Sequence, residues 1–84
     1  MYTIKLIKKK EIKFDDGKKE MVTDFVRCVE CDEYTQKFDD NNTMILLSLF
    51  KKNELMQGVD LKHADRKLLD IYVESEKGDT LSRI

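Results

Sequence analysis

The chain has 84 residues, of which 40% are hydrophobic and 39% are charged, and its formal net charge is -1. This length allows a single small domain over residues 1–84, and the organised apolar pattern argues against disorder. The balanced charge removes the usual argument for a nucleic-acid binder. No apolar run is long enough for a membrane span and the N-terminus lacks the order of a signal peptide, so we expect a cytoplasmic protein.

Residues 2–14 and 19–34 are two alternating apolar runs on either side of Asp16 and Gly17. An Asp-Gly pair between such runs is a strong hairpin signal. The sequence therefore predicts one long antiparallel β-hairpin that turns at these two residues.

A two-residue turn at Asp16-Gly17 also predicts the register of the hairpin. One face would be mostly apolar, with Arg27 opposite Leu6 as its weak spot. The other face would pair Lys13 with Glu20 and Lys9 with Asp24. The expected pairs on the apolar face are Ile12 and Met21, Lys8 and Phe25, Ile4 and Val29, and Tyr2 and Cys31.

The only two cysteines, Cys28 and Cys31, form a single C-V-E-C on the second predicted strand. A structural zinc needs four ligands, and the chain offers no second pair of this kind and only one histidine, His63. Positions three apart on a strand also point to opposite faces. We therefore expect two ordinary thiols, no metal and no cofactor; a zinc shared between two copies is the alternative.

The segment between residues 33 and 42 is polar and rich in Asp and Asn, which predicts a connection and a helix N-cap. Residues 43–57 follow as the most apolar segment, dominated by Leu and Met and closed by Gly58. This composition predicts a helix, with a strand over residues 43–50 as the alternative. Met44, Leu47 and Leu55 lie on a side of the helix that one sheet cannot cover, so they are candidate partner-binding residues unless the C-terminal segment buries them.

In the C-terminal third, residues 67–75 alternate apolar and polar side chains and predict a strand, and residues 80–84 predict a short strand or tail. The leading fold class is α+β: a long N-terminal antiparallel hairpin, one central α-helix, and one or two further antiparallel strands. If residues 43–50 form a strand, a small mostly β barrel is the alternative.

Catalytic chemistry finds little support in the sequence. His63 and Asp65 are the obvious acid/base candidates and Ser48 and Ser75 the nearby hydroxyl nucleophiles, but no pattern places them together and no Gly-rich phosphate loop is present. We therefore expect that the protein is not an enzyme.

Two functional classes follow from these observations. The first is a small protein-binding or self-associating module, with a homodimer as one form of self-association. The composition, thirteen Lys against three Arg with no Pro or Trp, suggests an accessory protein of a phage or mobile element that modulates a host protein. The second is a single-stranded nucleic-acid binder that uses lysines and aromatic residues of the hairpin. Its candidate residues are Lys5, Lys8, Lys9, Lys10, Tyr2 and Tyr34.

Overall fold

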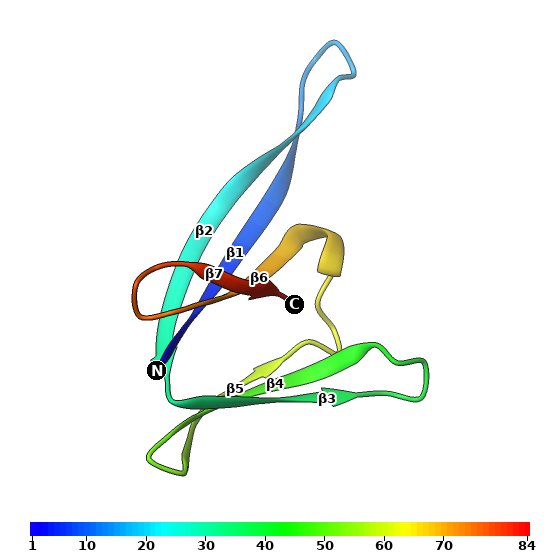
Figure 1. Cartoon of the computed structure of the whole chain (residues 1–84). Coiled ribbons are helices and arrows are strands. Elements are labelled where there is room, and N and C mark those ends of the chain that lie inside the picture. The colour runs from blue at the N-terminus through cyan, green and yellow to red at the C-terminus, as the bar shows by residue number, and fades with distance from the viewer.

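The structure, a computed structural model that describes residues 1–84, consists almost entirely of β-strands (Figure 1). It contains no α-helix, so the predicted α+β class is wrong. The alternative was a small mostly β barrel, and the fold is indeed small and mostly β, with its strands in two separate sheets. No helix is long and apolar enough to cross a membrane. The elements are β1 (Tyr2–Lys13), β2 (Lys19–Cys31), β3 (Glu33–Phe38), β4 (Met44–Lys51), β5 (Glu54–Asp60), the short 3-10 helix η1 (Arg66–Leu68), β6 (Leu69–Glu74) and β7 (Thr80–Arg83).

The strands form two antiparallel sheets. One has the order β2-β1-β6-β7 and the other the order β3-β4-β5. In Figure 1 the strands of the two sheets run in different directions, and the β1–β2 hairpin projects well beyond the other elements. Because of this projection the molecule is elongated and measures 52 × 35 × 19 Å. The chain passes from one sheet to the other at Asp32, between β2 and β3.

The core lies between the inner faces of the two sheets. Alternation along each strand sends every second side chain inward. The first sheet contributes residues of β1 and β6 and the last residue of β2, and the second contributes residues of β4 and the residue that follows β5. The nine core residues are Ile4, Leu6, Cys31, Met44, Leu47, Leu49, Leu61, Ile71 and Val73.

The predicted helix over residues 43–57 is wrong, because this segment is a second hairpin made of β4 and β5. Its two-residue loop, Lys52 and Asn53, has φ angles of 52° and 65°. Two left-handed residues in a two-residue loop are typical of the type I′ turn, whose twist matches that of the flanking strands. The alternative strand over residues 43–50 is close to β4 as observed.

The predicted N-terminal hairpin is present, but its second strand ends at Cys31 and not at residue 34, because residues 33 and 34 begin β3 of the other sheet. The predicted register is correct only in the half nearest the core. There Ile4 faces Val29 and Lys8 faces Phe25 as predicted. The loop contains three residues, because the Phe14 amide donates to the Lys18 carbonyl at 2.8 Å, and Gly17 takes a φ of 83°. Because the loop is one residue longer than predicted, each residue of β1 in the outer half of the hairpin pairs one residue earlier on β2 than predicted.

A β-bulge between the two halves of the hairpin removes that shift. Lys8 faces Phe25 and Lys9 faces Thr23, which leaves Asp24 as the extra residue of β2. The predicted pairs of Ile12 with Met21, Lys13 with Glu20 and Lys9 with Asp24 are consequently wrong. Ile12 faces Glu20 instead.

The predicted connection over residues 33–42 is only partly correct. Residues 33–38 form β3, an edge strand. Because most of its side chains are exposed, its sequence is polar and resembles that of a loop. The turn predicted from the Asp and Asn residues follows it. There the Asp39 carboxylate accepts hydrogen bonds from the amides of Asn41 and Thr43, both at 2.9 Å.

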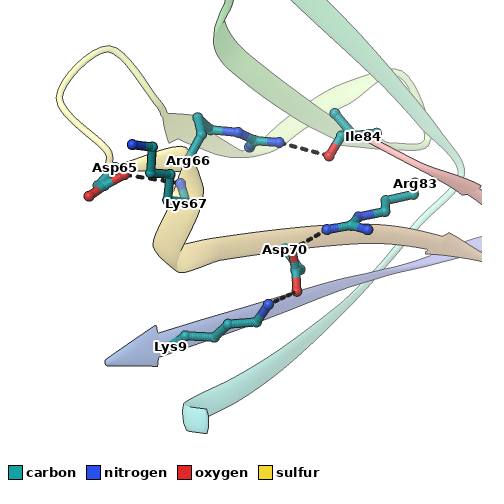
Figure 2. Close-up of polar contacts among 7 residues, drawn as sticks. All are labelled: Lys9, Asp65, Arg66, Lys67, Asp70, Arg83 and Ile84. Atoms are coloured by element: carbon teal, nitrogen blue, oxygen red, sulfur yellow. Dashed lines mark hydrogen bonds and ion pairs between the residues drawn. The ribbon is translucent and has the colours of Figure 1, made fainter. Parts of the chain in front are cut away.

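Both predicted C-terminal strands are present, as β6 and β7. β6 pairs with β1 from Thr3 to Lys8, and β7 covers its other edge. Asp70 on β6 is buried, and its carboxylate lies 2.6 Å from Lys9 Nζ and 2.7 Å from Arg83 Nη2 (Figure 2). One carboxylate therefore joins β1, β6 and β7.

Candidate functional site

The outer part of the first hairpin stands alone. The last pair between β1 and β6 is Lys8 with Leu69, so residues 9–24 have no third strand beside them. We call residues 9–24 the arm (Figure 1). Every arm residue except Lys9 and Val22 is exposed. An isolated two-stranded ribbon is at best marginally stable in water, so an arm of this length is an unusual feature.

Large apolar side chains are exposed on the arm and at its base. Ile12, Phe14 and Met21 of the arm are 36%, 48% and 46% exposed, and Phe25 and Val26 at its base are 50% and 49% exposed. By the register of the two strands, Ile12 and Met21 lie on opposite faces of the ribbon. Burial is the ordinary fate of such side chains, and apolar surface left exposed is a common feature of interaction sites.

The charges of the arm cancel. It carries five lysines and five carboxylates, the latter from Glu11, Asp15, Asp16, Glu20 and Asp24. Two ion pairs cross the ribbon, between Lys10 and Asp24 at 3.8 Å and between Lys19 and Glu11 at 3.6 Å. Such exposed pairs contribute little stability, but they leave the arm without a field that would attract a polyanion.

A pocket of about 380 Å³ opens where the arm leaves the body of the protein. It lies between β1 and β2 of one sheet, β5 of the other, and the segment from His63 to Leu69. Its apolar walls are Leu6, Phe25, Val59, Ala64, Leu68 and Leu69, and its polar lining is Lys8, Arg27, Gln57, His63 and Asp65.

Two cations of this pocket have no carboxylate partner. Arg27 Nη2 donates to Gln57 Oε1 at 3.0 Å, a bond that joins β2 to β5, and Arg27 makes no ion pair. Lys8 Nζ lies 5.7 Å from the centre of the Phe25 ring, a cation–π contact, and also makes no ion pair. The Asp65 carboxylate accepts from the Lys67 amide at 3.0 Å at the start of η1 (Figure 2).

The three residues predicted to bind a partner are divided by the structure. Met44 and Leu47 belong to the core, where Met44 is 8% exposed and Leu47 is fully buried. Sheet pairing rather than helix packing places them there. Leu55 alone is exposed, at 62%, beside the β4–β5 turn.

The residues predicted to bind nucleic acid do not form one surface. Lys5 and Lys9 occupy the opposite face of β1 from Lys8 and Lys10, because side chains alternate along a strand. Lys5, Lys9 and Lys10 each lie within 4.0 Å of a carboxylate oxygen.

The two candidate aromatic residues are also engaged. The rings of Tyr2 and Tyr34 meet edge to face at 5.5 Å, and both pack against the core. Bases would need open ring faces on which to stack.

The two cysteines lie on opposite faces of β2, as strand geometry predicts. Cys28 is exposed, whereas Cys31 is fully buried, and both are free thiols. Burial, with a smaller contribution from the Asp32 carboxylate, raises the pKa of the Cys31 thiol. No three His, Cys, Asp or Glu side chains gather in a way that could hold a metal ion.

Of the four candidate catalytic side chains, His63 and Asp65 both line the pocket. Ser48 lies in β4 and Ser75 lies in the turn after β6, and neither lines the pocket. The structure therefore does not place a hydroxyl nucleophile beside the histidine. Arg27 is the charged pocket residue that was not predicted as a site residue, although its position opposite Leu6 already indicated a charge on the apolar face.

Comparisons of the chain with protein-family models, with curated proteins and with solved structures found no match.

Proposed function

We propose that the protein acts by binding another protein through its arm. The observation that supports this proposal is that exposed apolar side chains lie on both faces of residues 9–24, Ile12 on one face and Met21 on the other, where no third strand pairs with the ribbon. Contact with a partner would bury them, and burial of apolar surface is the main favourable term in association.

The chemistry of the arm favours a protein over a nucleic acid. A nucleic-acid surface is recognised largely through unpaired cations, and the arm carries equal numbers of lysines and carboxylates. The arm has no net charge to repel or select a charged partner, and its exposed apolar side chains supply surface that a protein contact would bury.

The backbone of the outer strand of the hairpin, β2, is also available for contact with a partner. β2 is an edge strand along its whole length of 13 residues, so its outward amides and carbonyls are free to pair with a strand of a partner. The bulge at Asp24 interrupts this edge, which leaves two shorter segments for pairing.

A pull-down from lysate of the source cells tests the proposal. The double variant Ile12→Ser and Met21→Ser should lose a partner protein that the wild type retains, because both side chains are exposed apolar groups of the arm. The matched control is Leu55→Ser, which removes an exposed apolar side chain from the other sheet and should keep the partner.

Two results would contradict the proposal. Loss of the partner in the Leu55→Ser variant alone would move the site to the β4–β5 hairpin. Recovery only of nuclease-sensitive material would favour the nucleic-acid alternative.

Light scattering on the purified protein shows whether the partner is a second copy, because a dimer would have twice the mass of 10.0 kDa. We propose the cytoplasm as the site of action, since both cysteines are free thiols.

A further inference from the structure

We propose that the pocket at the base of the arm binds a small molecule that joins a carboxylate to an apolar body. This inference is independent of the protein-binding role of the arm. Its volume of about 380 Å³ lies within the range of small-molecule sites, and its six apolar residues surround a few polar groups, as in most such sites.

The apolar body of the ligand would lie against the inner faces of the two sheets. Leu6 on β1 is 7% exposed, and Val59 and Leu69 are partly buried side chains that pack against the core. These residues form a floor that belongs to the folded body rather than to the arm. A ligand there would replace water over apolar side chains, which is favourable.

Arg27 would receive the carboxylate. Its guanidinium has five N–H donors, of which one is engaged by Gln57, and the Gln57 bond holds the side chain in place across the two sheets. A planar guanidinium suits a carboxylate because the two groups can form two parallel hydrogen bonds.

The remaining charges of the lining also favour an anion. Lys8 and Arg27 are cations and Asp65 is the one carboxylate, so the lining has a net charge of +1 with His63 neutral. The Asp65 carboxylate is engaged by the Lys67 amide at 3.0 Å. Lys8, held over the Phe25 ring, places a second cation at the rim.

A nuclear magnetic resonance titration with sodium octanoate tests this proposal on the full chain. We expect saturable shifts of the amide signals of Leu6, Val59 and Leu69. Octanol, which has the same chain without the charge, and octyltrimethylammonium, which has the opposite charge, should bind at least about tenfold more weakly, because each lacks the charge-assisted hydrogen bonds to Arg27.

Two variants locate the site. Arg27→Gln should weaken octanoate binding about tenfold, whereas the matched control Lys5→Gln, on the opposite face of β1, should leave it within about twofold. Ala64→Leu fills the pocket without changing its charge and should also weaken binding, which covers the case in which Arg27→Gln impairs folding.

Three outcomes would overturn the proposal. Equal binding of octanol and octanoate would show that no anion is recognised. Shifts that do not saturate, or that centre on the arm, would show adsorption to exposed apolar side chains. Unchanged binding in Arg27→Gln would show that the charge of Arg27 does not recognise the ligand and only protects the edge strand β2.

Discussion

Ile4 and Ile12 lie on the same face of the same strand, yet Ile4 is fully buried and Ile12 is 36% exposed. The difference lies in what stands beside them. β6 and the second sheet cover the first half of β1, whereas nothing covers the arm. The comparison teaches that one strand can supply the core with its inner half while its outer half leaves apolar side chains exposed.

The largest expected effect separates these two halves. Ile4→Ala should lower the free energy of unfolding by about 2–5 kcal/mol, because it leaves a cavity in the core. The same change at Ile12 should cost less than about 1 kcal/mol. Urea denaturation followed by circular dichroism measures both. Equal losses would mean that the arm is packed in solution and would break the comparison.

The second effect concerns the carboxylate that joins the base of the arm to β6 and β7. Asp70→Asn should lower the free energy of unfolding by about 1.5–3 kcal/mol, the usual contribution of hydrogen bonds to charged groups. Asp40→Asn is the matched control, since Asp40 is exposed and makes no ion pair. A loss in the control as large as in Asp70→Asn would contradict this account.

We also expect the difference in stability between the wild type and Asp70→Asn to depend on pH. The hydrogen bond from Lys9, followed by that from Arg83, lowers the pKa of the Asp70 carboxyl below its ordinary value, even though burial acts in the opposite direction. The stabilisation is therefore fully present above the pKa of an unfolded aspartate, near 3.9, and disappears as the pH falls through the lower folded pKa. The stabilities of the wild type and Asp70→Asn should converge in strong acid. A constant difference down to that range would show that Asp70 acts through packing alone.

A smaller effect sharpens the description of the second sheet. Lys52→Asn with Asn53→Gly should raise the free energy of unfolding by about 1 kcal/mol, because Asn-Gly is the favoured pair for a type I′ turn. The urea midpoint measures the change. Lys51→Asn, one residue outside the loop and without a left-handed φ, should bring no gain. A loss on introducing Asn-Gly would contradict the type I′ turn.

The smallest effect compares two positions on β2. Iodoacetamide should modify the exposed Cys28 readily and Cys31 only slowly, because Cys31 is buried and burial raises its pKa. Cys28→Ser should change stability by less than about 0.5 kcal/mol. Mass spectrometry over time resolves the two thiols, and equal modification rates would show that β2 opens near its end.

The strands and turns whose formation depends on neighbouring residues could be predicted from the sequence. The alternation of β1, β2 and β6 identified these strands, and Asp16-Gly17 identified the turn. The exact loop length could not be predicted, because Asp15-Asp16-Gly17 suits a three-residue loop as well as Asp16-Gly17 suits a shorter one. The compensating bulge at Asp24 likewise has no local signal.

Three strands, β3, β4 and β5, were missed by the leading prediction for physical reasons. β3 is an exposed edge strand whose polar side chains resemble a loop. β4 is rich in Leu, a good helix former, and tertiary pairing overrides this weak preference. The Lys52-Asn53 turn lacks the glycine that would have revealed the second hairpin.

The candidate site was less predictable than the fold. The pocket collects residues from β1, β2, β5 and the segment around η1, which are far apart in the sequence. The one local signal was the charge of Arg27 on an otherwise apolar face. The exposure of the arm could not be predicted from its residues, since Ile12 and Met21 look like core residues until the extent of β6 is known.

Shortening the arm is the most direct test of the claim that it serves binding and not folding. Residues 10–22 would be replaced by Asn-Gly, which closes the hairpin beyond the Lys9–Thr23 pair and keeps Lys9 beside Asp70. We predict that the shortened protein keeps the circular dichroism spectrum of a β-protein and a cooperative thermal transition, and that it no longer retains the partner of the wild type. A shortened protein that is folded and still retains the partner would contradict the account.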